Sequence, residues 1–371
     1  SIIAAHYEQA GEVAKAVEYL GYSAERSFQL AEFSDAIEIV DHALALVAED
    51  ASLDSLRARL LVQKGNIHSE KGAYVEARSY LEPGLELARR AGDPKTVAKA
   101  LGHLGRILNW LGEYDVARVY LGEAYAIVQS QDDLSGQVFI SRQLGNVAIV
   151  TGEHADAVRY LNESLSLARS IDDLDSAAAA LNSLGENAYA ENQPDDALHF
   201  YDQAFALACK VGNRSDMAMI QANMGIVYLQ RGDYAACRTH TLEALSLARA
   251  IESAWMTASA LHVLGTAAIH AGQETLALEY LAESTRLMRQ IGSEAFLTSL
   301  LPDYALILHR RGQVEWAFSL LDLAHSHPAC EADTRLEIER ILLGWGRPAD
   351  ALERPPVGDL WAEIDKLQAL F

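Results

Sequence analysis

The stretch LGHLGRILNWLGEYDVARVY, residues 101–120, contains the pattern that decides the fold. It carries one glycine at 105, a second at 112 and a small residue at 117, and this frame returns every 40 residues. The first glycine recurs at Gly65, Gly105, Gly145, Gly185, Gly225 and Gly265, with Ala305 in the seventh place. The second recurs at Gly72, Gly112, Gly152, Gly232, Gly272 and Gly312, with Asn192 in its one gap. A period of this length indicates an array of stacked structural repeats.

Each unit is predicted to be a helix–turn–helix. In one unit, Asp93 suits an N-cap and Pro94 the first helical position. The first helix should run to about Leu111, and Gly112 suits the left-handed conformation that ends a helix. The second helix should span residues from about 115 to 130. Later units offer caps at Asp133, Asp173, Asn213, Ser253 and Ser293.

Three regions follow from where the frame begins and ends. Residues 1–50 are predicted to be a helical lead-in with a degenerate first repeat, containing helices at 2–9, 13–20, 24–30 and 31–46. Residues 51–330 hold seven 40-residue units. Residues 331–371 are predicted to be capping helices, with a helix at 334–343, a linker at 353–358 and an amphipathic helix at 359–371. The last helix should cover the end of the final repeat, although it could instead block the groove.

Composition limits the classes of function. The chain has 371 residues, with 30 Lys and Arg against 52 Asp and Glu, which gives a net charge of −22. Such a surface repels nucleic acid and anionic lipid, so neither is an expected partner. No apolar run reaches the ~18 residues that a membrane span needs. Cys209, Cys237 and Cys330 are odd in number and widely spaced, which predicts free buried thiols and a cytoplasmic protein.

Catalytic motifs are missing from the sequence. It contains no GxxxxGK[ST], HExxH or GxSxG pattern. Aspartate pairs at 132–133, 172–173 and 195–196 are interpreted as helix starts, where acidic groups are favourable. His325, His327 and Cys330 would supply only three of the four ligands of a closed zinc site. We therefore predict no catalytic residue, metal or cofactor, and a protein that is not an enzyme.

The recurring columns resemble the tetratricopeptide repeat, although its usual length is 34 residues. They are Leu101, Leu104, Gly105, Leu108, Gly112, Tyr114, Ala117, Leu121 and Ala124. The longer unit resembles the subclass found in sensor domains of bacterial STAND signalling ATPases and MalT-like regulators, and in polarity scaffolds. The opening AAHYEQAGEVAKAVEYLGYSAE, residues 4–25, resembles the segment that joins an ATPase region to such a sensor.

The resemblance implies a right-handed superhelical solenoid of about seven to eight units, whose first helices line a concave face. It implies a sensor domain of a larger signal-transduction protein, with a nucleotide-binding effector domain outside this sequence. The alternative is a free-standing scaffold for protein–protein interaction.

The resemblance also implies which positions face the groove: six and three residues before the first glycine, and one, four and five after it. The expected ligand-binding residues are Arg59, Asn66, Lys99, Arg106, Asn109, Arg142, Asn146, Asn182, Glu186, Tyr189, Met219, Ile226 and Leu229. The early units form a strip rich in cations and amides, and the later units present apolar side chains. Guanidinium groups bind carboxylates, and Asn can pair with a peptide backbone.

We therefore expect a peptide, protein or small-molecule ligand with acidic or peptide-like character. Four cations on one face should repel one another unless an acidic group offsets them. Arg142 and Asn146 resemble the basic–x3–Asn pair of peptide-binding repeats, whereas Glu186 in the corresponding Asn place argues against a simple carboxylate clamp.

Overall fold

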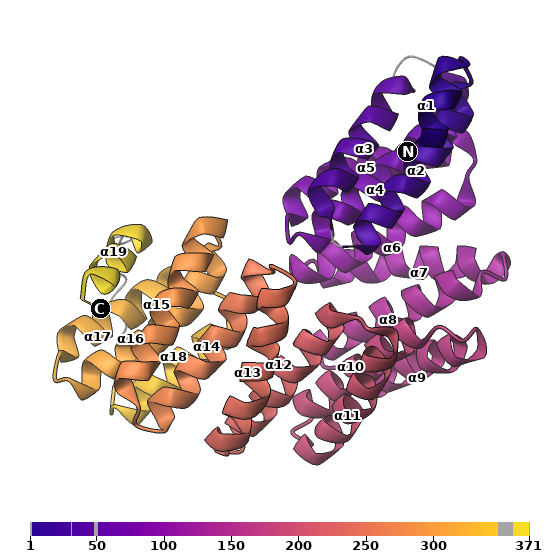
Figure 1. Ribbon diagram of the computed structural model, residues 1–371. Coiled ribbons are helices and arrows are strands. Elements are labelled where there is room, and N and C mark those ends of the chain that lie inside the picture. Colours follow the sequence, from indigo (N-terminus) through magenta and orange to yellow (C-terminus); the bar gives the residue numbers. More distant parts are fainter. Residues whose placement is uncertain (1, 31, 48–50, 348–358, 371) are drawn as a thin grey trace. The chain divides into compact units, whose positions relative to one another are not determined.

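The computed structural model describes residues 2–30, 32–47, 51–347 and 359–370 (Figure 1). Within these ranges the regular structure is helical and contains no strand, which confirms the all-α class. The lead-in contains α1 (Ile2–Gln9), α2 (Val13–Gln29), α3 (Phe33–Leu46) and the short 3₁₀ helix η1 (Ala51–Leu53). The C-terminal region contains α18 (Ala332–Gly344) and α19 (Leu360–Leu370). No helix of the described residues is long and apolar enough to cross a membrane.

The repeats between these regions alternate a first helix and a second helix, called here A helices and B helices. The A helices are α4 (Asp54–Glu70), α6 (Pro94–Trp110), α8 (Leu134–Val150), α10 (Leu174–Ala190), α12 (Arg214–Gln230), α14 (Ala254–His270) and α16 (Glu294–Arg310). The B helices are α5 (Tyr74–Ala91), α7 (Tyr114–Ser130), α9 (His154–Ser170), α11 (Pro194–Val211), α13 (Tyr234–Ala250), α15 (Glu274–Ile291) and α17 (Val314–Ser326). The chain divides into two compact units, Ser1–Leu207 (unit 1) and Ala208–Phe371 (unit 2), and each is described separately.

The first glycine of each repeat permits close packing of the A helix on its B helix. A Cβ atom added at Gly105 would lie 2.5 Å from Leu121 Cγ, and one at Gly265 would lie 2.8 Å from Leu281 Cδ2. Both distances are too short for real carbon atoms, so the leucine of the B helix fills the space that the glycine leaves. The glycine column is therefore a packing requirement, as the sequence predicted.

The second glycine ends the A helix in the left-handed region, with φ of 77° at Gly112. Asn192, which fills the gap in this column, adopts φ of 58°. Asparagine is among the residues that tolerate this conformation best. The predicted caps at Asp93, Asp133, Asp173, Asn213 and Ser253 each accept a backbone N–H of the first turn. Ser293 also lies at the predicted N-cap position, that of α16, but its hydroxyl makes no capping hydrogen bond.

The lead-in differs from expectation in one respect. Two helices were predicted over 13–20 and 24–30, but α2 is continuous through Gly21. Val17, Leu20 and Ala24 form one buried stripe, which tertiary packing holds together across the glycine. The Gly21 carbonyl accepts a hydrogen bond from Gln63 Nε2 of α4 at 3.1 Å.

Two further expectations concern the cysteines and the C-terminal region. Cys237 and Cys330 are buried free thiols, whereas Cys209 is exposed, so the expectation of burial is wrong for that residue. The predicted linker at 353–358 lies outside the described residues. The final amphipathic helix is present as α19, and its Leu360, Ile364 and Leu367 are buried in the apolar core of unit 2.

Candidate ligand-binding face

The A helices of unit 1 contact one another in succession, and their polar side chains meet across the repeats. Arg106 of α6 reaches back to α4, where Nη2 donates to Asn66 Oδ1 at 2.8 Å and to Ser69 Oγ at 3.2 Å. Its Nη1 donates to the carboxylate of Glu70. Two predicted site residues, Asn66 and Arg106, are thus brought together. The Arg106 guanidinium ties α4 to α6, and its charge is offset within the chain.

Arg59 is also paired within the chain. Its Nε donates to Asp93 Oδ2 at 3.2 Å, and Asp93 is the N-cap of α6. Burial alone would raise the pKa of Asp93, but hydrogen bonds from Thr96, Ser55 and Arg59 outweigh it and lower the pKa to about 2. Asp93 therefore stays charged and holds Arg59. Acidic side chains of the chain itself therefore offset two of the four cations, Arg59 and Arg106.

The remaining predicted residues of α6 and α8 differ in exposure. Lys99 is exposed, and Arg142 is half-buried with its guanidinium carbon 5.9 Å from the centre of the Phe139 ring. Asn109 and Asn146 are half-buried, and within the described structure each has an occluded Oδ1 with no hydrogen-bond partner. Leaving such an acceptor unpaired costs about 1–3 kcal/mol.

Repeat spacing relates these two asparagines. Ser69 of α4 and Arg106 of α6 are hydrogen-bonded to each other. Asn109 and Asn146 lie 40 residues after them and so occupy the equivalent positions in the next repeat. The same 37-residue spacing separates Thr266 from Asp303, which are bonded across α14 and α16. We call Asn109, Arg142 and Asn146, with the nearby Lys99, the α6–α8 cluster.

A neutral histidine lies beside the α6–α8 cluster. Loss of solvation lowers the pKa of His103 well below its usual range, and the charges of Arg106 and Lys99 lower it further. The centre of its ring lies 5.2 Å from that of Phe139. His103 therefore adds no positive charge to this face near neutral pH.

The other predicted residues lie further along the A helices. In α10, Asn182 is buried and its Nδ2 donates to Glu186 Oε1 at 2.8 Å, while Tyr189 is half-buried. In α12 of unit 2, Met219 is 36% exposed, and Ile226 and Leu229 are half-buried. Glu186 is thus occupied by a neighbouring amide, and the α12 positions are partly accessible apolar groups.

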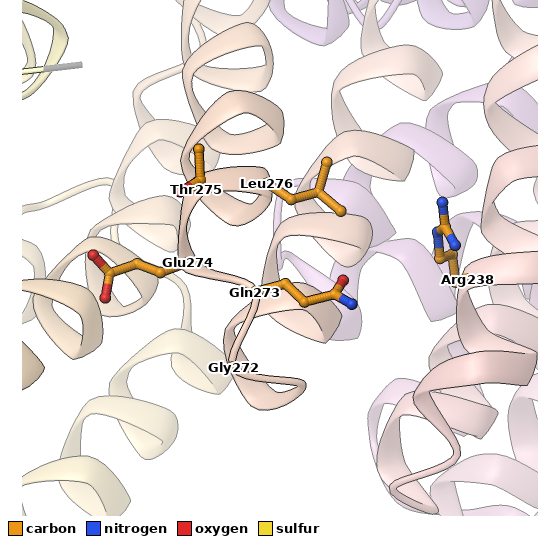
Figure 2. Close-up of a pocket in the computed structure, with 6 residues that line it drawn as sticks. All are labelled: Arg238, Gly272, Gln273, Glu274, Thr275 and Leu276. Carbon is orange, nitrogen blue, oxygen red and sulfur yellow. The ribbon is translucent and has the colours of Figure 1, made fainter.

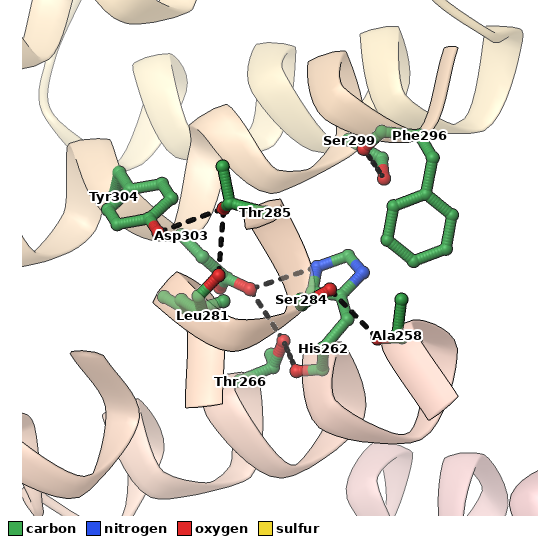
Figure 3. Close-up of polar contacts among 10 residues, drawn as sticks. All are labelled: Ala258, His262, Thr266, Leu281, Ser284, Thr285, Phe296, Ser299, Asp303 and Tyr304. Atoms are coloured by element: carbon green, nitrogen blue, oxygen red, sulfur yellow. Dashed lines mark hydrogen bonds and ion pairs between the residues drawn. The ribbon is translucent and has the colours of Figure 1, made fainter. Parts of the chain in front are cut away.

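The A helices of unit 2 contain a polar cluster that was not predicted. Asp303 of α16 is 2% exposed, and its Oδ2 accepts Thr266 Oγ1 at 2.6 Å and lies 3.1 Å from His262 Nε2 (Figure 3). Both partners lie on α14, so Asp303 joins the two A helices. The sequence offered one signal, an acidic residue within the otherwise apolar run of residues 300–308.

Glu337 of α18 lies near this cluster. Loss of solvation raises the pKa of Glu337, and the charge of Asp303 raises it further, whereas His262 and Arg340 act in the opposite direction. No set of three or more His, Cys, Asp or Glu side chains placed to hold a metal ion occurs among the described residues. The hydrogen bonds of Asp303 with His262 and Thr266 join the neighbouring helices α14 and α16.

A surface hollow of about 490 Å³ lies elsewhere in unit 2, between Arg238 of α13 and residues 272–276 (Figure 2). Arg238 and Gln273 project toward it from either side, while the carboxylate of Glu274 points away (Figure 2). Glu274 accepts Arg311 Nε at 2.5 Å. The hollow contains none of the predicted site residues.

Repeated helix pairs, small residues where they touch and a polar A-helix face define a helical-repeat scaffold. The family model for the tetratricopeptide repeat matches residues 56–130, 137–210 and 216–290. The chain belongs to the tetratricopeptide repeat family. Among curated proteins no match was found.

Several solved structures share the fold. A Rap protein complexed with Competence and Sporulation Factor is 11% identical, with 96% of this chain and 98% of that one covered and a TM-score of 0.63. Aspartyl phosphate phosphatase F from Bacillus subtilis is 10% identical, with 95% and 94% covered and a TM-score of 0.57. The apo form of RapI is 14% identical, with 74% and 98% covered and a TM-score of 0.56. At these identities the likeness shows the fold alone.

Proposed function

We propose that this chain is a protein- or peptide-binding module, and that an extended segment with acidic character binds at the α6–α8 cluster. The observation that carries the proposal is the pair of occluded amide oxygens, Asn109 Oδ1 and Asn146 Oδ1, without partners in the described structure. An extended peptide supplies backbone N–H donors for such oxygens. The oxygens are occluded in this conformation, but both residues are half-buried, so rotation of the side chains would turn the amide groups toward a ligand.

Charge supports an acidic ligand. Arg59 and Arg106 are paired with Asp93 and Glu70, whereas the exposed Lys99 and the half-buried Arg142 add positive charge beside the two asparagines. A bound carboxylate can accept two hydrogen bonds from one guanidinium. Arg106 and Asn66 then act as positioning residues that fix the spacing of α4 and α6. Asn182, Glu186 and Tyr189 extend the proposed face along α10 of unit 1. In unit 2, taken by itself, Met219, Ile226 and Leu229 of α12 are proposed contacts for apolar ligand groups.

The wider role is part of the same proposal. The long repeat and residues 4–25 support a cytoplasmic sensor domain that passes ligand binding to a STAND-type ATPase domain and performs no catalysis itself. The relative named as complexed with Competence and Sporulation Factor shares the fold, which is compatible with a peptide or protein partner here. A free-standing scaffold is the alternative. Reading the coding sequence on either side for a nucleotide-binding module separates the two.

Binding can be tested with an array of acidic peptides. Arg142→Glu should weaken capture by tenfold or more, because it replaces attraction with repulsion at the centre of the face. Arg238→Glu is the matched control, since it makes the same change of charge on a B helix and at none of the predicted site residues. Equal binding by both variants and the unchanged protein would refute the proposed site.

A further inference from the structure

Arginines near the ends of some B helices are held by the following B helix. Arg89 of α5 donates from Nη2 to both carboxylate oxygens of Glu123 on α7, each at 2.7 Å. Arg249 of α13 donates from Nη2 to Glu283 of α15 at 2.7 Å. Both pairs are 34 residues apart, so the contact belongs to the repeat geometry.

Arg289 of α15 holds the next place in this series, 40 residues after Arg249, but the residue 34 positions later is Leu323. The carboxylate comes instead from α19, where Arg289 Nη1 donates to Asp365. The same nitrogen donates to Gln368 Oε1 at 3.2 Å. The C-terminal helix thus supplies a contact that a B helix supplies elsewhere.

A second polar anchor and an apolar stripe fix α19 in place. Trp316 Nε1 of α17 donates to Glu363 Oε2 at 3.1 Å. Leu360, Ile364 and Leu367, spaced i, i+4 and i+7, are buried at 3%, 0% and 0% exposure. An 11-residue helix is marginal alone in water, so its order depends on the surface that receives it. That surface, formed around Arg289 of α15 and Trp316 of α17, is called here the α19 seat.

We propose that the α19 seat is a binding site for an amphipathic acidic helix of a partner protein, and that α19 is its intramolecular occupant. The partner helix would carry apolar residues at i, i+4 and i+7 and carboxylates at i+3 and i+5, the pattern of Leu360, Ile364, Leu367, Glu363 and Asp365. The Arg289 cation selects the acidic residue, and the apolar seat takes the stripe. Tethering gives α19 an effective concentration near the millimolar range, so a partner must outcompete it.

The test uses the full chain with Ile364→Asp and Leu367→Asp, which place charges in the apolar seat and release α19. The probe is a fluorescent synthetic peptide of residues 359–371, followed by anisotropy. The released variant should bind the peptide at least tenfold more tightly than the unchanged chain, because its own helix no longer competes. Failure of the released, still folded variant to bind would overturn the proposal.

Two further variants identify the seat. Arg289→Glu in the released background should weaken peptide binding about fivefold, whereas Arg249→Glu, whose partner is Glu283, should leave it unchanged. Equal effects of the two would overturn the proposal. If the double variant does not fold, Asp365→Lys should raise peptide binding to an otherwise intact chain about fivefold, and no rise would count against the seat. If the unchanged chain is a dimer and the release variant is a monomer, the α19 seat binds a second copy of this chain and not a partner protein.

Discussion

The A-helix faces of the two units use similar positions in different ways. In unit 2, the buried carboxylate of Asp303 is bound by His262 and Thr266, so one oxygen is satisfied inside the chain. In unit 1, the corresponding spacing places Asn109 opposite Asn146, and both amide oxygens lack partners in the described structure. The comparison shows that equivalent positions of one scaffold can either bond across neighbouring repeats or carry amide oxygens without a partner in the described structure.

The scaffold itself should behave alike in the two units. Gly105→Val and Gly265→Val each force a side chain into a leucine of the B helix, and each should lower the free energy of unfolding by about 3 kcal/mol. Urea denaturation measures both. Gly122→Ala is the control: no atom outside its own helix lies within 4 Å of an added Cβ, so it should be neutral or stabilising by up to about 1 kcal/mol. Tolerance of valine at 105 but not at 265 would mean that the scaffolds differ.

Removing the inter-repeat polar contact should separate the two faces. Asp303→Ala takes the partner from His262 and Thr266 and should cost about 2 kcal/mol of stability. Asn146→Ala removes an occluded acceptor that has no partner in the described structure and should leave stability unchanged or raise it by up to about 1 kcal/mol. Thermal unfolding of the two variants measures the difference. Equal losses would show that the amide of Asn146 is as fully used within the chain as the carboxylate of Asp303.

The helix caps give a smaller contrast with a pH dependence. Asp93→Ala in unit 1 should cost about 1–2 kcal/mol, whereas Ser293→Ala in unit 2 should cost only a few tenths, because Ser293 makes no capping bond. The pKa of Asp93 is lowered from 3.8 to about 2 in the folded chain. Its contribution is therefore complete above pH 4 and is lost as the pH falls toward 2. A variant whose deficit is undiminished at pH 2 would contradict this account of the cap.

The smallest effect concerns the turns that follow the B helices. Glu252 in unit 2 and Asp132 in unit 1 hold left-handed φ values of 54° and 51°, at places where other repeats have glycine. Glu252→Gly should stabilise the chain by about 0.5–1 kcal/mol, because glycine adopts this conformation without the steric cost that a Cβ brings. Asp132→Gly should gain less, because aspartate tolerates this region better. Differential scanning calorimetry resolves such shifts, and a loss of stability at position 252 would mean that its carboxylate has an unrecognised role.

The regular part of the fold was predictable because it repeats. Gly105 and Gly112 determine helix packing and helix ends, and Asp93 determines a helix start, through local rules that act in each unit. Even the gap at Asn192 follows from the tolerance of asparagine for positive φ. The one long α2 was not predicted, because Gly21 weakens the helix locally while its buried stripe holds it together.

The polar face was only partly predictable. The positions came from the repeat register, but the pairing of Arg106 with Glu70 and of Arg59 with Asp93 depends on side-chain reach between helices. The contacts of Asp303 were not predicted, because its partners Thr266 and His262 lie 37 and 41 residues away in the sequence. The contact of Arg289 with Asp365 joins residues 76 apart and lies outside the repeat altogether.

Hydrogen exchange with and without an acidic peptide selected by the array tests the central claim most directly. Ligand binding at the α6–α8 cluster predicts added protection of backbone amides in α6 and α8, centred near residues 106–110 and 142–150, with α14 and α16 unchanged. Protection confined to α14 and α16, or to the B helices, would contradict it.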